Sequence, residues 1–113
     1  ELLLLAYLEV EDWDAADALL RQYDENTAAA NYDRILVEFA RNRGSAKLPR
    51  LVKEAVVQNP HVIPYLLGKK RLPREMPEYY GYGDEREARI YALTHVHLWR
   101  VRPELLQLLE NNR

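Results

Sequence analysis

The stretch NPHVIPYLLGKKRLPREMPEYYGYG, residues 59–83, decides how the rest of the chain can fold. It contains four of the six prolines, three of the four glycines and four of the eight tyrosines. A proline inside a helix removes an amide donor and clashes with the preceding turn. We therefore expect residues 61–83 to form an ordered connector, non-helical or only partly helical, between residues 1–60 and 84–113 of one continuous domain.

The segment before the connector has the periodicity of amphipathic helices. Apolar residues recur at three- and four-residue intervals, which places them on one face of each helix. The pattern predicts four helices, at residues 2–10, 13–23, 28–43 and 45–58. We expect Gly44 to end the third of these in a left-handed conformation and Ser45 to cap the fourth.

A long helix is expected to follow the connector, with Asp84 as its N-cap and Glu87 at the spacing of a capping box. A helix that is apolar on two sides packs between layers of other elements. One of its two apolar stripes consists of Ala88, Tyr91, Ala92, His95 and Trp99. The second stripe consists of Ile90, Leu93 and Val101. A final helix is predicted at residues 104–110, and no segment alternates as a strand would, so the expected class is all-α.

A recurrence of roughly 32 residues in the first four helices has the period of a helical repeat. The residues that carry it are Tyr7, Ala16, Leu20 and Tyr23 in the first unit and Tyr32, Phe39, Leu48, Val52, Ala55 and Pro60 in the second. Residues 12–16, Asp-Trp-Asp-Ala-Ala, match the turn and opening of a repeat's second helix. In these residues the chain resembles tetratricopeptide (TPR) repeats, although Leu36 and Leu48 stand where that family has small residues. The resemblance implies stacked antiparallel hairpins whose first helices line a concave groove, with the first hairpin truncated at its N-terminus.

Residues 59–109 carry a second resemblance, in Asn59 to Val62, in Gly83-Asp84 and in Trp99. They resemble the C-terminal region of bacterial repeat proteins of unassigned function and, more distantly, the suppressor-of-tumorigenicity-seven family. The resemblance implies a related fold and brings no catalytic residues with it. Some relatives carry cysteine-rich metal modules, whereas this chain has no cysteine.

Composition narrows the function classes. Without cysteine the chain has no disulfide, thiolate metal site or thiol nucleophile, which fits a reducing, cytoplasmic location. The apolar run at residues 2–6 lacks a basic leader and is too short to span a bilayer, so we expect no membrane association and a fragment that begins inside a helix. Residues 1–33 have a net charge of −8 and residues 34–74 a net charge of +8. This asymmetry fits either an interaction surface or attraction between neighbouring helical layers.

Residues with catalytic potential do not form a recognisable site. His95 and His97 point about 200° apart on a helix, so they cannot share a metal, and His95 is expected to be a neutral core histidine. The acidic pairs in residues 11–17 are expected on a solvated face. The sequence Gly81-Tyr82-Gly83 precedes a helix N-terminus that could attract an anion, but it lacks the lysine and spacing of a phosphate loop. We predict no catalytic, cofactor or metal site, and no enzyme activity.

The connector supplies the predicted partner-binding residues. They are Lys69, Lys70, Arg71, Arg74, Tyr79, Tyr80 and Tyr82. Three roles are open: the tyrosines cover helix surface and fasten the connector, the basic residues contact an acidic protein, or the set stacks on and neutralises a single-stranded nucleic acid. The slightly acidic chain and the small number of charges argue against nucleic acid.

These patterns predict a protein–protein interaction scaffold whose partner is unknown. One alternative is a nucleic-acid-associated module that uses the basic connector, and another is a non-catalytic part of a larger enzyme. If the chain is truncated, the helix at residues 2–10 has lost a neighbour. We then expect this helix to pair in a homodimer or to be partly exposed.

Overall fold

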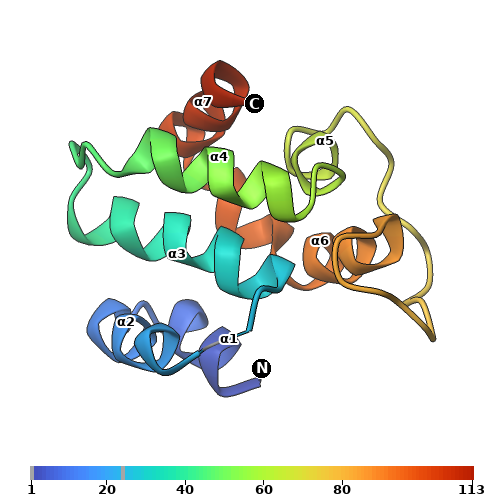
Figure 1. Ribbon diagram of the computed structural model, residues 1–113, viewed down its shortest axis with the longest axis horizontal. Coiled ribbons are helices and arrows are strands. Elements are labelled where there is room, and N and C mark those ends of the chain that lie inside the picture. Colours follow the sequence, from blue (N-terminus) through green and yellow to red (C-terminus); the bar gives the residue numbers. More distant parts are fainter. Residues whose placement is uncertain (1, 24) are drawn as a thin grey trace.

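A computed structural model describes residues 2–23 and 25–113, and within them every regular element is a helix (Figure 1). The elements are α1 (Leu2–Glu9), α2 (Trp13–Gln22), α3 (Ala28–Arg41), α4 (Leu48–Gln58), α5 (Val62–Leu66), α6 (Glu85–Arg100) and α7 (Pro103–Asn112). The predicted all-α class is thereby confirmed.

The first four helices pack in the order of the chain, α1 on α2, α2 on α3 and α3 on α4. Figure 1 shows α3 and α4 side by side and antiparallel. Short polar side chains begin two of these helices, since Asp12 accepts from the Ala15 amide and Thr27 from the Ala30 amide. The α3 residues Tyr32, Ile35, Leu36 and Phe39 are buried, as their spacing predicts.

Two predictions about the turn between α3 and α4 are wrong. Helix α3 ends at Arg41, because Asn42 turns to an extended conformation with φ −154°. No left-handed residue is then needed, and Gly44 does not have a positive φ. Ser45 does not cap α4 either. Its hydroxyl accepts from the Lys47 amide within the turn, and α4 begins only at Leu48.

The connector contains one short helix, α5, although it is rich in proline. Pro64 lies in the first turn of α5, where a missing amide costs little because the first amides of a helix have no intrahelical acceptor. Gly68, with φ 77°, ends α5, and the Gly68 and Lys69 amides donate to the carbonyls of Tyr65 and Pro64. These two bonds have the pattern of a Schellman motif. Beyond them the chain runs without regular structure to α6.

Helix α6 is the central element, packing against α1, α3, α5 and α7. Its first predicted stripe is buried throughout, with Trp99 fully buried and His95 7% exposed. The second stripe is predicted incorrectly at Val101, which is 72% exposed because α6 ends at Arg100 and Val101 lies in the turn to α7. Val96 and Leu98, which flank the first stripe on its two sides, are buried as well.

The position of α6 changes the expected groove. Helices α1 and α3 are the first members of the two expected hairpins, so TPR-like stacking would leave them facing a concave surface. In this chain α6 packs against both of them. The expected groove along α1 and α3 is therefore not left open, because the chain's own α6 contacts both helices.

Candidate functional site

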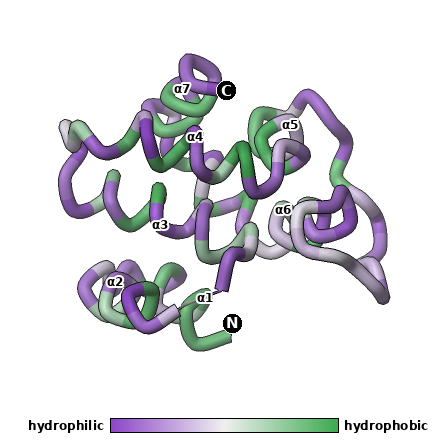
Figure 2. The backbone as a smooth tube through the Cα atoms, viewed as in Figure 1, coloured by the Kyte–Doolittle hydropathy of each residue, from purple (hydrophilic) through white to green (hydrophobic). Residues whose placement is uncertain are grey.

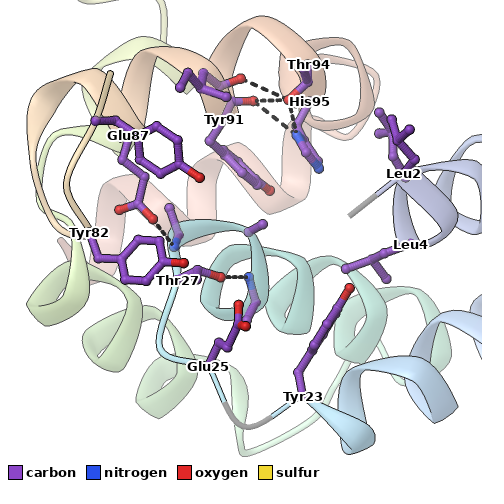
Figure 3. Close-up of a pocket in the computed structure, with 16 residues that line it drawn as sticks. Leu2, Leu4, Tyr23, Glu25, Thr27, Tyr82, Glu87, Tyr91, Thr94 and His95 are labelled. Carbon is purple, nitrogen blue, oxygen red and sulfur yellow. Dashed lines mark hydrogen bonds between the residues drawn. The ribbon is translucent and has the colours of Figure 1, made fainter. Parts of the chain in front are cut away.

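A cavity of about 370 Å³ remains where α1, the start of α3 and α6 do not close on one another (Figure 3). Leu2 and Leu4 of α1 lie on one side of it, and Tyr82 of the connector lies on the other. Tyr91 and His95 of α6 form a third side. Figure 2 shows that the start of α1 is a continuous apolar run. The cavity therefore lies between α1, the start of α3 and α6, and it has largely apolar walls.

Three consecutive alanines at the start of α3 explain why the cavity exists. Ala28, Ala29 and Ala30 all line it, and their methyl groups are too short to fill the space between α3 and α6. Ala28 and Ala30 are buried, whereas Ala29 is half-buried. A single larger side chain at position 29 would project into the cavity.

The rim carries aromatic rings and a carboxylate. The rings of Tyr80 and Tyr82 have centroids 6.1 Å apart and are tilted by 47°. Tyr80 is 50% exposed and Tyr82 is 63% exposed. The Glu25 carboxylate, followed by Tyr80, raises the pKa of the Tyr82 hydroxyl above its ordinary value. Glu25 and Tyr82 thus place negative charge and a π-face at the same edge of the cavity.

A buried carboxylate, Glu87, holds three segments together beside the cavity. Its Oε2 accepts from the Ala28 amide at 2.9 Å, which is the first amide of α3. Its Oε1 accepts from the Gly83 amide at 2.8 Å and from the side-chain amides of Asn59 (3.0 Å) and Gln58 (3.1 Å). Glu87 therefore does not close a capping box on Asp84. It joins the start of α3, the end of α4 and the start of α6.

Asn59, at the end of α4, completes this junction. Its side-chain amide also donates to the Asp84 carbonyl at 2.9 Å, and its Oδ1 accepts from the His61 amide at 3.0 Å. Its backbone carbonyl accepts from the Tyr32 hydroxyl at 2.6 Å. Asn59 is fully buried, so these bonds satisfy polar groups that water cannot reach.

A second buried polar chain lies under the cavity. The indole of Trp99 donates to the Tyr91 hydroxyl at 2.9 Å, and that hydroxyl donates to Oδ1 of Asp33 at 2.8 Å. Burial, and then the Asp33 charge, raise the pKa of Tyr91 well above its ordinary value. The other Asp33 oxygen lies 3.3 Å from Nε2 of His95. Asp33 is fully buried, so its Oδ1 links α3 to Tyr91 of α6, while its Oδ2 lies near His95 without a hydrogen bond to the described residues.

His95 lines the cavity, and both of its ring nitrogens lie close to groups of the protein itself. Its Nε2 faces Asp33, and its Nδ1 lies 2.6 Å from the Thr94 hydroxyl and 3.1 Å from the Tyr91 carbonyl (Figure 3). The imidazole is also stacked on Tyr91, with ring centroids 4.1 Å apart. A general base needs a nitrogen within reach of a substrate proton. The burial predicted for His95 is confirmed, and the arrangement is that of a structural histidine.

The basic residues predicted to bind a partner divide into two kinds. Lys69 pairs with Glu110 at 3.0 Å, and Lys70 pairs with Glu85 at 2.7 Å. The hydrogen bond to Glu85 raises the pKa of Lys70, and the same bond lowers the pKa of Glu85. Arg71 and Arg74 are exposed, and neither forms an ion pair with another residue in the described part of the chain. Half of the predicted cluster thus holds the connector to α6 and α7.

The three predicted tyrosines are exposed, whereas Tyr65 is a buried ring of the connector. Tyr79 is 75% exposed, and Tyr80 and Tyr82 are at the rim of the cavity. The Tyr65 hydroxyl donates to Oε1 of Glu85 at 3.0 Å, and the same hydroxyl accepts from Nε of Arg89 at 3.1 Å. The fastening ring therefore comes from α5, where a helix can direct it inward.

The glycine-rich approach to α6 offers no anion site. The Gly81 amide donates to Oδ2 of Asp84 at 2.7 Å, and the Gly83 amide donates to Glu87. Asp84 Oδ1 also accepts from the Glu87 amide, which confirms Asp84 as the N-cap. The protein's own carboxylates take the donors that a phosphate would need.

Two further features can be stated for the described part of the chain. No group of three or more His, Asp or Glu side chains there is arranged to hold a metal ion. None of its helices has the length and apolar character needed to cross a bilayer.

Asp33, which links α3 to α6, and Glu25, which lies at the rim of the cavity, are not singled out by the helical periodicity of the sequence. Asp33 lies between Ala30 and Val37, at helical spacing along a face that is otherwise apolar. A lone carboxylate on such a face is a signal of a buried polar contact. Glu25 gives no comparable signal, because its position at the rim depends on the connector folding back beside it.

Comparison with known proteins does not place the chain in a family. No protein-family model matches it, and neither a curated protein nor a solved structure is detectably similar to it.

Proposed function

We propose that this protein binds a partner protein by taking one side chain of the partner into the cavity between α1, α3 and α6. The observation that carries the proposal is the cavity itself, which is lined by apolar side chains of α1, α3 and α6 and by tyrosines of the connector. The volume of the cavity, about 370 Å³, lies within the range of roughly 300–1,000 Å³ that is usual for binding pockets. On this proposal the scaffold role expected from the sequence is carried out by this pocket.

The composition of the pocket supports recognition of a side chain. Apolar walls from Leu2, Leu5 and Ile90 surround a small number of polar groups, as in most ligand sites. Leu2 is 86% exposed, so apolar surface continues beyond the cavity onto α1. Burying one apolar side chain contributes about 1.5–3 kcal/mol. Because a single anchor contributes so little, we expect binding to be weak and reversible unless further contacts add to it.

The polar groups at the pocket do not favour catalysis. Both ring nitrogens of His95 face groups of the protein, and the Glu87 carboxylate accepts from four donors. For this reason the proposal assigns binding, and not proton transfer, to the pocket. Tyr80 and Tyr82, which belong to the predicted partner-binding set, lie at the pocket. Arg71, Arg74 and Tyr79 are exposed on the connector and would contact a partner only outside it.

Filling the pocket tests the proposal. Ala29→Leu would place a larger side chain in the cavity, while Ala18→Leu makes the same change on the exposed face of α2. Both variants should keep the helical circular dichroism spectrum. We expect proteins that co-purify with the wild type from cells that express it to be retained by Ala18→Leu and lost with Ala29→Leu. An unchanged set of bound proteins for a folded Ala29→Leu would refute a role for the pocket.

A further inference from the structure

We propose that the side chain accepted by this pocket is a lysine of the partner protein, an alkyl chain that ends in an ammonium ion. The inference rests on the proposed function and names its ligand. It depends on three features of the cavity: its charge, its aromatic rim and its apolar walls.

The charge of the pocket is negative. Its lining includes Glu25 and Glu87, and no lysine or arginine occurs among the described residues that form it. The hydrogen-bond donors that Glu87 engages are backbone and side-chain amides, all of them uncharged. Amide donors stabilise the carboxylate without cancelling its charge. The lining therefore favours a cation over a neutral or anionic side chain.

The start of α3 does not reverse this preference. A helix N-terminus carries partial positive charge on its free amides. Here the Ala28 amide donates to Glu87 and the Ala30 amide donates to the Thr27 hydroxyl. The partial positive charge of the helix end offsets only part of the full Glu87 charge, so the lining, which also includes Glu25, stays negative.

The aromatic rim provides a second attraction for a cation. Four tyrosines line the cavity, and the faces of aromatic rings are the negative part of their quadrupole. Tyr80 and Tyr82 stand side by side at the rim, with Glu25 near Tyr82. A cation over such a ring is bound roughly two- to fivefold more tightly at an exposed site, and about 30-fold where water is excluded.

The apolar walls select the shape of the cation. Leu2, Leu5 and Ile90 can cover a chain of methylene groups while the charged end remains at the wet, tyrosine-lined rim. Long basic side chains bury their stems and keep their heads hydrated in this way. The ammonium of lysine is compact and donates in three directions, which suits a rim of hydroxyl and carboxylate oxygens.

The test uses small probes on the full chain. Binding of N-acetyl-lysine methylamide is followed by the NMR shifts of the Ala29 and Ala30 amides, in parallel with the norleucine derivative, which has the same stem without the charge. We expect saturable shifts with the lysine derivative and at least fivefold weaker binding of the norleucine derivative. Glu25→Gln should weaken lysine binding about two- to fivefold, while Glu78→Gln, on the exposed connector, should leave it unchanged.

Each other outcome is decisive. Equal binding of the two derivatives would overturn the lysine assignment and leave an apolar pocket, so the proposed function would stand. Butylammonium binding more tightly than the lysine derivative would assign the pocket to a free amine and overturn the partner-protein ligand. If Glu25→Gln binds the lysine derivative as tightly as the wild type does, the Glu25 carboxylate does not recognise the ammonium, and the charge argument for lysine is overturned. No shift with any probe, together with unchanged co-purification by Ala29→Leu, would overturn both proposals.

Discussion

The buried carboxylate of Glu87 should contribute more to stability than any exposed acidic residue of the chain. In Glu87→Gln the side chain keeps its shape, but one of its two oxygens becomes an NH₂ group. The remaining oxygen can still accept from Gly83 and Asn59 if the NH₂ faces α3. The Ala28 amide then meets a donor and loses its acceptor.

The magnitude follows from the number of buried donors left without an acceptor. One such amide costs about 1–3 kcal/mol, so Glu87→Gln should lower the free energy of unfolding by about that amount. Glu87→Ala leaves the Ala28 and Gly83 amides and one buried Asn59 side-chain N–H without this acceptor, so at the same cost for each donor it should cost about 3–9 kcal/mol. Domains of this size are stable by roughly 5–15 kcal/mol, so the alanine variant approaches the limit of folding and the glutamine variant does not.

The assay is urea unfolding followed by circular dichroism, with Glu78→Gln as the matched exposed control. Native-state hydrogen exchange adds a local readout. Ala28 is the first residue of α3 and its amide has no intrahelical acceptor, so only Glu87 protects it. We expect the Ala28 amide to be protected in the wild type and to exchange rapidly in Glu87→Gln. A Glu87→Gln variant within about 0.5 kcal/mol of Glu78→Gln, with Ala28 still protected, would refute this reasoning.

Three further predictions concern backbone strain and pH. Gly83→Ala should lower the stability of the protein in thermal unfolding by about 1–2 kcal/mol or more, because φ is 88° and a Cβ would lie 2.9 Å from a backbone oxygen of α4. The control Gly44→Ala, at a position with open space and no positive φ, should be neutral or slightly stabilising. The Glu87 amide is the main cause of the lowered Asp84 pKa, so the stabilisation by this carboxylate is present above the ordinary aspartate pKa and is lost as pH falls through the lowered value. The stability difference between wild type and Asp84→Asn, which keeps an N-cap oxygen, should therefore shrink on acidification, and a difference that grows would contradict the sign. Burial raises the pKa of Tyr91, so its stabilisation is complete below the ordinary tyrosine pKa of about 10 and is lost above it. Tyrosinate absorbance should show Tyr91 ionising only together with the loss of helical signal, and ionisation of every tyrosine in a still-helical protein would argue against its burial.

Much of the local structure could be predicted because it depends on neighbours in the chain. The caps at Asp12 and Asp84 follow from short polar side chains before apolar periodicity. The turn after α3 could not be predicted in detail, since Asn42, Gly44 and Ser45 are all residues that favour turns and several backbone paths satisfy them. The seven-residue candidate site on the connector remains a prediction.

The sequence by itself determined the all-α class, most helix positions and the interruption between α4 and α6, because these depend on side chains three or four positions apart and on where proline and glycine stand. Only the tertiary structure decided that α6 packs against both α1 and α3, and that Glu87 caps a helix 59 residues away. Only the tertiary structure leaves a cavity over three alanines. Each of these depends on which segments, distant in the chain, meet in space. Local periodicity predicts which face of a helix is apolar. It does not predict which other helix packs on that face, or where the contact between the two helices ends.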